Sequence, residues 1–326
     1  MKFLITGAAG FIGFHTCSQL LKQGHEILGV DNLNDYYEVS LKKSRLNLLK
    51  ADPKFTFFKL DISNYSKLQK EFSQHYDVEY IIHLAAQAGV RHSLKDPFIY
   101  ENSNLKGLLN ILELVKKFKK LRHFIFASSS SVYGGIRELP YNTDQFTDRP
   151  ISFYAATKMS GELMCHCYSH LYNIPITCLR FFTVYGPWGR PDMAAFSFTK
   201  KILEGETIRV FNNGEMVRDF TYIDDTVNGV VACTFEPPKP NKMAVPFSVY
   251  NIGNNNGENL MKFIKIIEKE LGKDAIIEFV PQQPGEVLET CADSSSAERA
   301  FGFSSKIDIS EGIPLFIEWY REYYDV

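Results

Sequence analysis

The sequence predicts an α/β protein with a doubly wound parallel sheet and a smaller mixed α/β region. Two patterns indicate this fold class. Short apolar runs alternate with stretches whose apolar residues recur at helical spacing, which is typical of repeated βαβ units. The runs are also apolar without interruption, so we expect strands that helices bury on both faces. The length of 326 residues is enough for one large core and part of a second.

The predicted strands and helices alternate from the N-terminus onward. The first strand is predicted at 2–6, before a glycine turn, and the first helix stops at Gly24, because glycine commonly ends a helix. The alternation then continues to residue 182. Further strands are predicted at 26–31, 55–62, 78–86, 123–130 and 174–182, and further helices at 65–72, at 108–118 and after Pro150.

The pattern changes after residue 182, where two glycines and two prolines crowd between residues 186 and 191. Residues 249–254 again read as a strand that ends in turn residues, so the chain is expected to return to the first sheet. We therefore predict a first domain at 1–182, rejoined by about 226–254, and a second domain at 183–225 and 255–326.

Composition argues against several kinds of partner. The 36 basic and 38 acidic residues give a net charge of −2 and no basic footprint for nucleic acid. No run reaches the roughly 20 apolar residues of a membrane span. The N-terminus lacks the features of a signal peptide, so we expect a cytoplasmic protein with reduced cysteines. We expect no metal site, because Cys165, His166, Cys167 and His170 lie on one predicted helix and do not converge.

The turn after the first predicted strand reads GAAGFIG and predicts a dinucleotide site. Gly7 allows a tight turn, Gly10 lets the backbone approach a pyrophosphate, and Gly13 permits close packing of helix on strand. The N-terminus of the following helix would add N–H donors and a positive partial charge. A glycine triplet also occurs in ordinary strand-to-helix turns, so its context matters.

Asp31 provides that context, because it ends the second predicted strand. Its carboxylate could accept hydrogen bonds from both ribose hydroxyls and would repel a 2′-phosphate, so NAD is preferred over NADP. The alternative is a solvated acid at a strand end. Other residues along this edge of the sheet are expected to contact the cofactor, namely Phe11, Ile12, Asn32, Asp61, Ile62, Leu84, Ala85 and Ala86.

The segment YAATK places Tyr154 and Lys158 four residues apart, on one face of a helix. A tyrosine with a pKa near 10 is a poor base, and a neighbouring cation would stabilise its phenolate for proton transfer at neutral pH. The alternative is a surface tyrosine beside a solvated lysine. The serine-rich end of the strand before it favours the catalytic interpretation.

GAAGFIG, Asp31, the serine-rich strand end and YAATK together resemble the extended short-chain dehydrogenase/reductase superfamily, which implies a Rossmann-type fold with a substrate-binding domain. Longer segments resemble its UDP-glucuronate 4-epimerase branch, which consists of NAD-dependent nucleotide-sugar epimerases. These segments are DNLNDYYEVSLKKSRL, HLAAQAGVRHSL, SSSSVYG, RFFTVYGPWGRPDMA and VRDFTYIDD. The likeness runs from residue 1 to beyond residue 310.

The resemblance implies roles for several residues. Ser129 would hydrogen-bond the reacting hydroxyl, Tyr154 would be the acid/base with Lys158 as its partner, and Asn104 matches an asparagine near the active-site helix. Related dehydratases have Asp and Glu where two serines follow Ser129 here, so elimination is not implied. The implied reaction is 4-epimerisation: the sugar loses a proton to Tyr154 and a hydride to NAD, rotates as a 4-keto sugar, and regains both.

The resemblance further implies UDP-glucuronate as the substrate and UDP-galacturonate as the product, in polysaccharide biosynthesis. Arg190 would bind the sugar carboxylate, since a guanidinium pairs with a planar anion, and the alternative is a surface loop arginine. The other matched substrate contacts are Ser129, Thr183, Phe211, Arg218, Gln283 and Glu286. Glu286 replaces the family's more usual aspartate, and Val217 replaces an arginine that is common in the branch.

Two other functions stay open. One is a 4-epimerase of UDP-glucose or UDP-N-acetylglucosamine, and the other is a non-catalytic NAD-binding sensor. A sensor could dispense with Ser129, Tyr154 and Lys158, whereas this sequence has all three. The resemblance also implies a homodimer, formed through a four-helix interface that includes the helix after Pro150.

Overall fold

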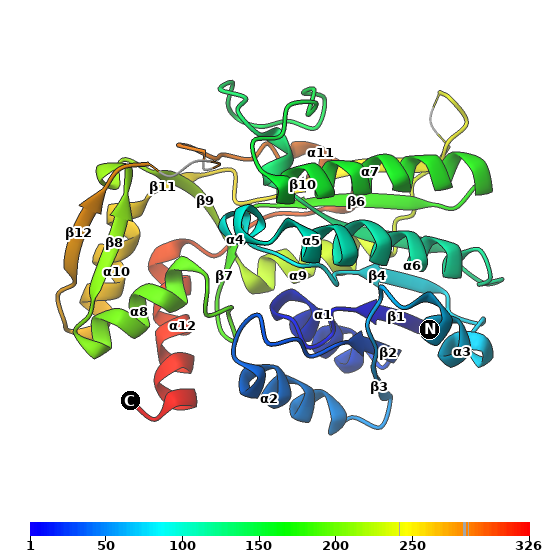
Figure 1. Ribbon diagram of the computed structural model, residues 1–326, viewed down its shortest axis with the longest axis horizontal. Helices are drawn as coiled ribbons and strands as arrows, with labels where there is room; N and C mark the ends of the chain where they lie inside the picture. The colour runs from blue at the N-terminus through cyan, green and yellow to red at the C-terminus, as the bar shows by residue number, and fades with distance from the viewer. Residues whose placement is uncertain (241, 283–284, 286) are drawn as a thin grey trace.

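The central feature of the computed structural model is a parallel sheet that follows the predicted order of elements (Figure 1). The structure describes residues 1–240, 242–282, 285 and 287–326, and in these the sheet has seven strands in the order β10-β6-β5-β4-β1-β2-β3. The strands are β1 (Lys2–Thr6), β2 (Glu26–Asp31), β3 (Phe55–Lys59), β4 (Tyr80–His83), β5 (His123–Ser129), β6 (Ile176–Phe181) and β10 (Phe247–Ile252). The predicted doubly wound, Rossmann-type sheet is confirmed.

Helices cover both faces of this sheet, as Figure 1 shows. Alternate residues of β1 point to opposite sides, so Phe3 and Ile5 join one core and Leu4 joins the other. The first core packs under α1 (Phe11–Lys22), α2 (Val39–Lys50) and α9 (Ile223–Thr234). The other face carries α3 (Tyr65–Glu71), α4 (Val90–Lys95), α5 (Pro97–Tyr100), α6 (Gly107–Val115) and α7 (Phe153–Tyr172).

The remaining elements form a smaller mixed region beside the carboxyl ends of the strands. One small sheet contains β7 (Thr183–Tyr185), β9 (Val217–Tyr222) and β11 (Gly257–Asn259), and another pairs β8 (Thr207–Phe211) with β12 (Ile276–Val280). The helices here are α8 (Ala194–Glu204), α10 (Leu260–Leu271) and α12 (Ile309–Tyr324), whereas α11 (Ser295–Phe301) packs against β10 of the main sheet and against α9. Among the described residues, no helix combines the length and apolarity needed to cross a membrane.

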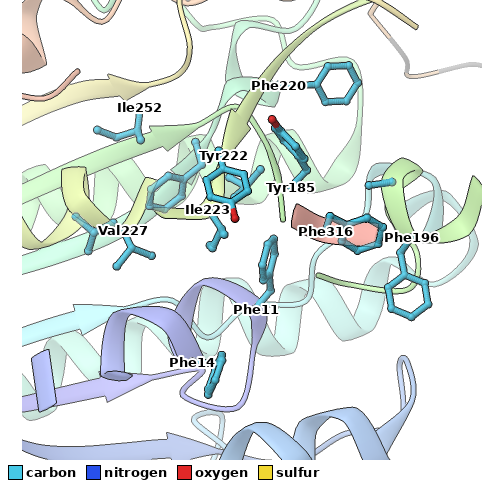
Figure 2. Close-up of a cluster of buried hydrophobic side chains, with 14 of the residues drawn as sticks. Phe11, Phe14, Tyr185, Phe196, Phe220, Tyr222, Ile223, Val227, Ile252 and Phe316 are labelled. Atoms are coloured by element: carbon cyan, nitrogen blue, oxygen red, sulfur yellow. The ribbon is translucent and has the colours of Figure 1, made fainter. Parts of the chain in front are cut away.

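One apolar cluster connects the sheet to this smaller region. Figure 2 shows Phe11 of α1 facing Tyr222 of β9 and Phe316 of α12, and these three side chains are buried. The same cluster continues to Phe196 of α8. Because it buries side chains from both regions, the cluster fixes their relative position and so fixes the geometry of the edge between them.

Two predicted strands are too long, and helix α2 was not predicted. The strand predicted at 55–62 ends at Lys59, and the strand predicted at 78–86 covers only Tyr80–His83, because the chain turns at the edge of the sheet after each. Strand β3 is also half exposed, since it lies at the sheet edge. Helix α2 was not predicted, because Lys42 and Arg45 lie among its buried residues and interrupt the apolar spacing.

Candidate functional site

The glycine loop between β1 and α1 has almost no room for side chains. Gly7 has a φ of +74°, and a Cβ added there would lie 2.8 Å from the backbone N of Ala85. A Cβ on Gly13 would lie 2.0 Å from the carbonyl oxygen of Gly7. Gly10 precedes α1 without a side-chain cap, and the Phe11 side chain is in the apolar core, so the first turn presents backbone N–H groups. This close-packed cradle fits a pyrophosphate.

Carboxylates follow the ends of β2 and β3. Asp31 accepts from the N–H of Leu33 at 2.8 Å and from the N–H of Ala9 at 3.2 Å, and burial raises its pKa. Burial also acts to raise the pKa of Asp61, but hydrogen bonds from Ser63 and Asn32 outweigh it and lower the pKa. A recess of about 360 Å³ is lined by Asn32, Asn34, Lys59, Leu60 and Asp61. These groups fit the adenosine end of a dinucleotide.

The turn after β4 packs directly on the glycine loop. Thr6 holds this turn, because its carbonyl accepts from the N–H of Leu84 and its hydroxyl accepts from the N–H of Ala85, each at 3.2 Å. Ala86 follows in the same turn. The Ile62 side chain is 7% exposed and lies against Gly107, where an added Cβ would meet it at 2.6 Å. The structure therefore brings the predicted cofactor contacts to one edge of the sheet.

Ser129, Tyr154 and Lys158 meet at the end of β5 and the start of α7. The Lys158 Nζ donates to the carbonyl of Ala127 at 2.7 Å and lies 5.9 Å from the centre of the Tyr154 ring. Burial lowers the pKa of Lys158 to about 8. Burial raises the pKa of Tyr154, while a hydrogen bond with Ser129 and the positive charge of Arg190 act to lower it. The arrangement can hold and transfer one proton.

Asn104 lies in a π-helical turn, Glu101–Lys106, and is buried. Its amide nitrogen donates to the Gln87 carbonyl and to the Thr157 hydroxyl, each at 3.0 Å, and its oxygen accepts from the Gln87 N–H at 2.8 Å. The wider π turn projects this side chain out of the regular helical row. Asn104 thus connects the loop after β4 to the first turn of α7.

A buried ion pair joins β6 to α7 next to the end of β5, and it was not predicted. Arg180 of β6 donates from Nε and Nη2 to the two carboxylate oxygens of Glu162 at 2.9 and 2.8 Å. The Ser128 hydroxyl also donates to Glu162. Arg180 stacks 4.9 Å from the centre of the Tyr133 ring. The sequence signal was the position of Glu162 one helical turn after Lys158, which places both on the same face of α7.

Arg190 lies on the loop of residues 186–192, between β7 and α8. Its Nε donates to Asp192 at 3.0 Å and its Nη2 donates to the second oxygen of the same carboxylate, which keeps the pKa of Asp192 low despite burial. The Tyr36 hydroxyl donates to Asp192 at 3.2 Å. The guanidinium is therefore already arranged in the geometry in which it binds a carboxylate.

The other residues matched to substrate contacts are spread along the smaller region. Thr183 begins β7 and is partly buried. Phe211 ends β8, and the guanidinium of Arg91 lies 4.1 Å from its ring centre. Arg218 of β9 donates to the carbonyls of Val287 at 2.7 Å and Leu288 at 2.9 Å, so it also fixes the chain opposite. Gln283 and Glu286 lie outside the described residues.

Arg45 and His15 also make contacts that the sequence did not predict. Arg45 donates to carbonyls of both the glycine loop and the 186–192 loop, and the His15 Nε2 lies 2.9 Å from the Pro187 carbonyl oxygen. One signal could have identified Arg45: it shares a helix face with Leu41 and Leu49, four residues away on each side, where an apolar residue is expected.

Comparisons with known proteins agree with this geometry. Residues 3–253 match the family model of the NAD dependent epimerase/dehydratase family. Protein CapI of Staphylococcus aureus is 49% identical over 99% of both chains. The UDP-glucuronate 4-epimerase of Thermodesulfobacterium geofontis is 43% identical over 98% of this chain and 96% of its own.

A solved structure is also similar over nearly the whole chain. The crystal structure of UDP-glucuronic acid 4-epimerase from Bacillus cereus, in complex with UDP-glucuronic acid and NAD, has a TM-score of 0.90 at 37% identity and covers 99% of this chain and 100% of that chain. The resemblance found in the sequence is confirmed. This chain belongs to the NAD dependent epimerase/dehydratase family.

Proposed function

We propose that this protein is an NAD-dependent UDP-sugar 4-epimerase that interconverts UDP-glucuronate and UDP-galacturonate. One arrangement carries the choice of substrate: the Arg190 guanidinium, arranged for a carboxylate, lies where its charge acts on the Tyr154 phenol and opposes the rise in pKa that burial causes. A neutral sugar has no group that uses this cation beside the reacting carbon. The UDP-glucuronate 4-epimerase relatives support the same choice.

The glycine loop, Asp31 and Asn32 would hold NAD, and Lys158 and Tyr154 would face its reactive end. Bound NAD supplies a hydride acceptor, and later a donor, for C4 of the sugar. Tyr154 would remove the proton from the 4-hydroxyl and return it to the same oxygen after the 4-keto sugar has rotated to present its other face, while Ser129 hydrogen-bonds that oxygen. The buried cation of Lys158 favours the phenolate form of Tyr154.

We assign cofactor binding to residues 1–182 together with 226–254, and sugar-nucleotide binding to 183–225 and 255–326. The pairing of β10 with β6 supports this division, because residues 247–252 belong to the seven-stranded sheet. The small sheets of β7, β9 and β11 and of β8 and β12 lie outside it. In this assignment Thr183, Phe211 and Arg218 contact the nucleotide sugar.

We propose a homodimer formed through α6 and α7. Leu163, Cys167 and Leu171 lie on one face of α7, four residues apart, and the two leucines are 69% and 62% exposed. Leu109 of the neighbouring α6 is 42% exposed. Sedimentation should give a dimer that Leu163→Lys weakens, whereas Leu48→Lys, at an exposed position on α2, leaves it intact.

The free cysteines support a cytoplasmic location, where thiols stay reduced.

The direct test is incubation with UDP-glucuronate and separation of the product. We expect UDP-galacturonate from UDP-glucuronate, and much slower turnover of UDP-glucose and UDP-N-acetylglucosamine. Equal or faster turnover of a neutral sugar nucleotide would contradict the proposed substrate. Bound NAD without turnover of any sugar nucleotide would instead indicate a cofactor sensor.

Tyr154→Phe tests the proton transfer. Removing one acid/base group typically lowers a rate by about 10²–10⁴-fold, and we expect a loss in kcat of this order with the fold intact. Tyr76→Phe is the matched control, because Tyr76 precedes β4 at the opposite edge of the sheet. Near wild-type turnover by Tyr154→Phe would disprove the role assigned to this hydroxyl.

A further inference from the structure

Arg45 is a buried cation whose hydrogen bonds, among the residues that the structure describes, go to uncharged groups. Its side chain is fully buried, and its four acceptors are three carbonyl oxygens and one phenol. The charge of Arg45 acts to lower the pKa of the buried Asp31, but a guanidinium that hydrogen-bonds no carboxylate among the described residues is still costly to bury, because the charge loses its hydration. The position therefore calls for a function that an apolar residue in the same stripe of α2 could not perform.

The guanidinium joins two loops that are far apart in the sequence. Its Nη1 donates to the carbonyl of Ala9, inside the glycine loop, at 2.8 Å. Its Nη2 donates to the carbonyls of Trp188 and Gly189, inside the 186–192 loop, at 2.6 and 3.2 Å. The Tyr37 hydroxyl accepts a further bond from Nη1 at 2.8 Å. One planar group thus fixes the distance between the cofactor cradle and the loop that carries Arg190.

The 186–192 loop needs this support because its backbone is strained. Trp188 has a φ of +61°, a conformation that is unfavourable for a bulky residue and is found mostly where surrounding contacts enforce it. This turn directs two successive carbonyls toward the same Nη2. A side chain at Gly189 would lie 2.9 Å from the carbonyl oxygen of Gly186, so the turn is also tightly packed.

Helix α1 anchors the same loop from a second side. Burial lowers the pKa of His15 to about 4, so the ring is neutral and can donate from Nε2 to the Pro187 carbonyl at 2.9 Å. The Trp188 ring lies 5.5 Å from the ring of Phe14. The loop that ends in Arg190 and Asp192 is therefore fixed to the helix whose first turn forms the cofactor cradle.

We propose that Arg45 is a positioning residue that couples the cofactor cradle to recognition of the sugar carboxylate. It keeps the Trp188 turn in its strained form, and this form aims Arg190 at the substrate. The inference rests on the proposed function, since the carboxylate is the group that Arg190 would bind. Lysine cannot replace Arg45, because its single ammonium cannot reach carbonyls on both sides in the fixed geometry of a guanidinium.

The test compares Arg45→Met and Arg45→Lys with the control Arg122→Met, which removes a surface guanidinium that pairs with Glu79. Calorimetry on the NAD-loaded proteins gives the dissociation constants of UDP-glucuronate and UDP-glucose. We expect both Arg45 variants to reduce the preference for UDP-glucuronate by at least about tenfold, because a misaimed Arg190 affects only the charged ligand. We also expect less NAD in the purified variants, and no change in Arg122→Met.

A preference that stays within about twofold of the wild type, with only stability reduced, would overturn the proposal. If neither Arg45 variant folds, the wild-type protein still tests the proposal. Its affinities for UDP-glucuronate and UDP-glucose are then measured with and without NAD. Coupling requires NAD to strengthen UDP-glucuronate binding more than UDP-glucose binding, and equal effects would refute it. These binding data are separate from turnover, so wild-type protein that fails to epimerise UDP-glucuronate would disprove the proposed function and not the coupling.

Discussion

Two arginine–carboxylate pairs, one beside the end of β5 and one in the 186–192 loop, have the same bonding pattern in different surroundings. In each pair the arginine donates from Nε and Nη2 to both oxygens of one carboxylate. The side chains of Arg180 and Glu162 are only 5% and 10% exposed, whereas those of Arg190 and Asp192 are 21% and 29% exposed. Geometry alone therefore does not distinguish a supporting pair from a binding pair.

Burial and additional partners make that distinction. Glu162 also accepts from Ser128, and Arg180 is packed on Tyr133, so neither group can exchange its partner without leaving a charge uncompensated. The pair of Arg190 and Asp192 is partly open to solvent, and an incoming carboxylate can take up the same guanidinium. We interpret the first pair as a permanent support and the second as an exchangeable site.

The largest expected effect comes from breaking the permanent pair. Glu162→Gln removes the anion but keeps the shape, so Arg180 stays buried without compensation, and we expect a loss of about 3–5 kcal/mol in the free energy of unfolding. Urea denaturation of the NAD-free protein measures it. Glu278→Gln is the control, because its exposed pair with Arg209 contributes at most about 1 kcal/mol. Similar losses in both variants would show that the buried pair supports the fold no more than an exposed one.

The next effect concerns Lys158, a buried cation one helical turn before Glu162. Its pKa is lowered from 10.5 to about 8 by burial, so between these values the unfolded chain binds the proton and the folded chain does not. The free energy of unfolding therefore increases as the pH rises from 8 to 10.5, by about 3 kcal/mol over the whole window. Below pH 8 both states bind the proton, so this increase is absent.

Urea denaturation of NAD-free wild type and Lys158→Met from pH 7 to 10 isolates this contribution, because the other titrating groups are common to both proteins. We expect the difference in free energy of unfolding to move in favour of the wild type as the pH rises. A difference that is constant with pH would show that Lys158 keeps its proton in the folded state. Glu162→Gln should lower the pKa further, since Glu162 acts to raise it.

The smallest effect is expected at the exchangeable pair, and it should appear in recognition rather than in stability. Arg190→Met removes the group that would bind the sugar carboxylate, so we expect kcat/KM for UDP-glucuronate to fall by about 100-fold. The value for UDP-glucose should change little, and so should the melting temperature. Arg209→Met controls for the loss of a surface guanidinium. Equal losses for both substrates would show that Arg190 supports the fold instead of selecting the sugar.

Features that depend on local residue spacing could be predicted from the sequence, whereas contacts between distant segments could not. Strands β1, β2 and β5 were predicted nearly to the residue, because each is a continuous apolar run that ends at a turn. The roles suggested for Gly7, Gly13 and Asp31 also depend on short-range spacing. The contacts of Arg45 could not be predicted, because they depend on two loops that meet only in the folded protein. The pairing of Glu162 with Arg180 likewise joins a helix to a strand.

The position of β10 has a consequence for how the chain folds as it is synthesised. Strand β6 ends at Phe181, but its outer neighbour β10 begins only at Phe247. A nascent chain that has emerged only to residue 182 exposes the edge of β6 with unpaired backbone groups, and such edges promote aggregation. The seven-stranded sheet therefore closes late, after much of the smaller region has left the ribosome, and a fragment cut at residue 182 would lack the outer strand of this sheet.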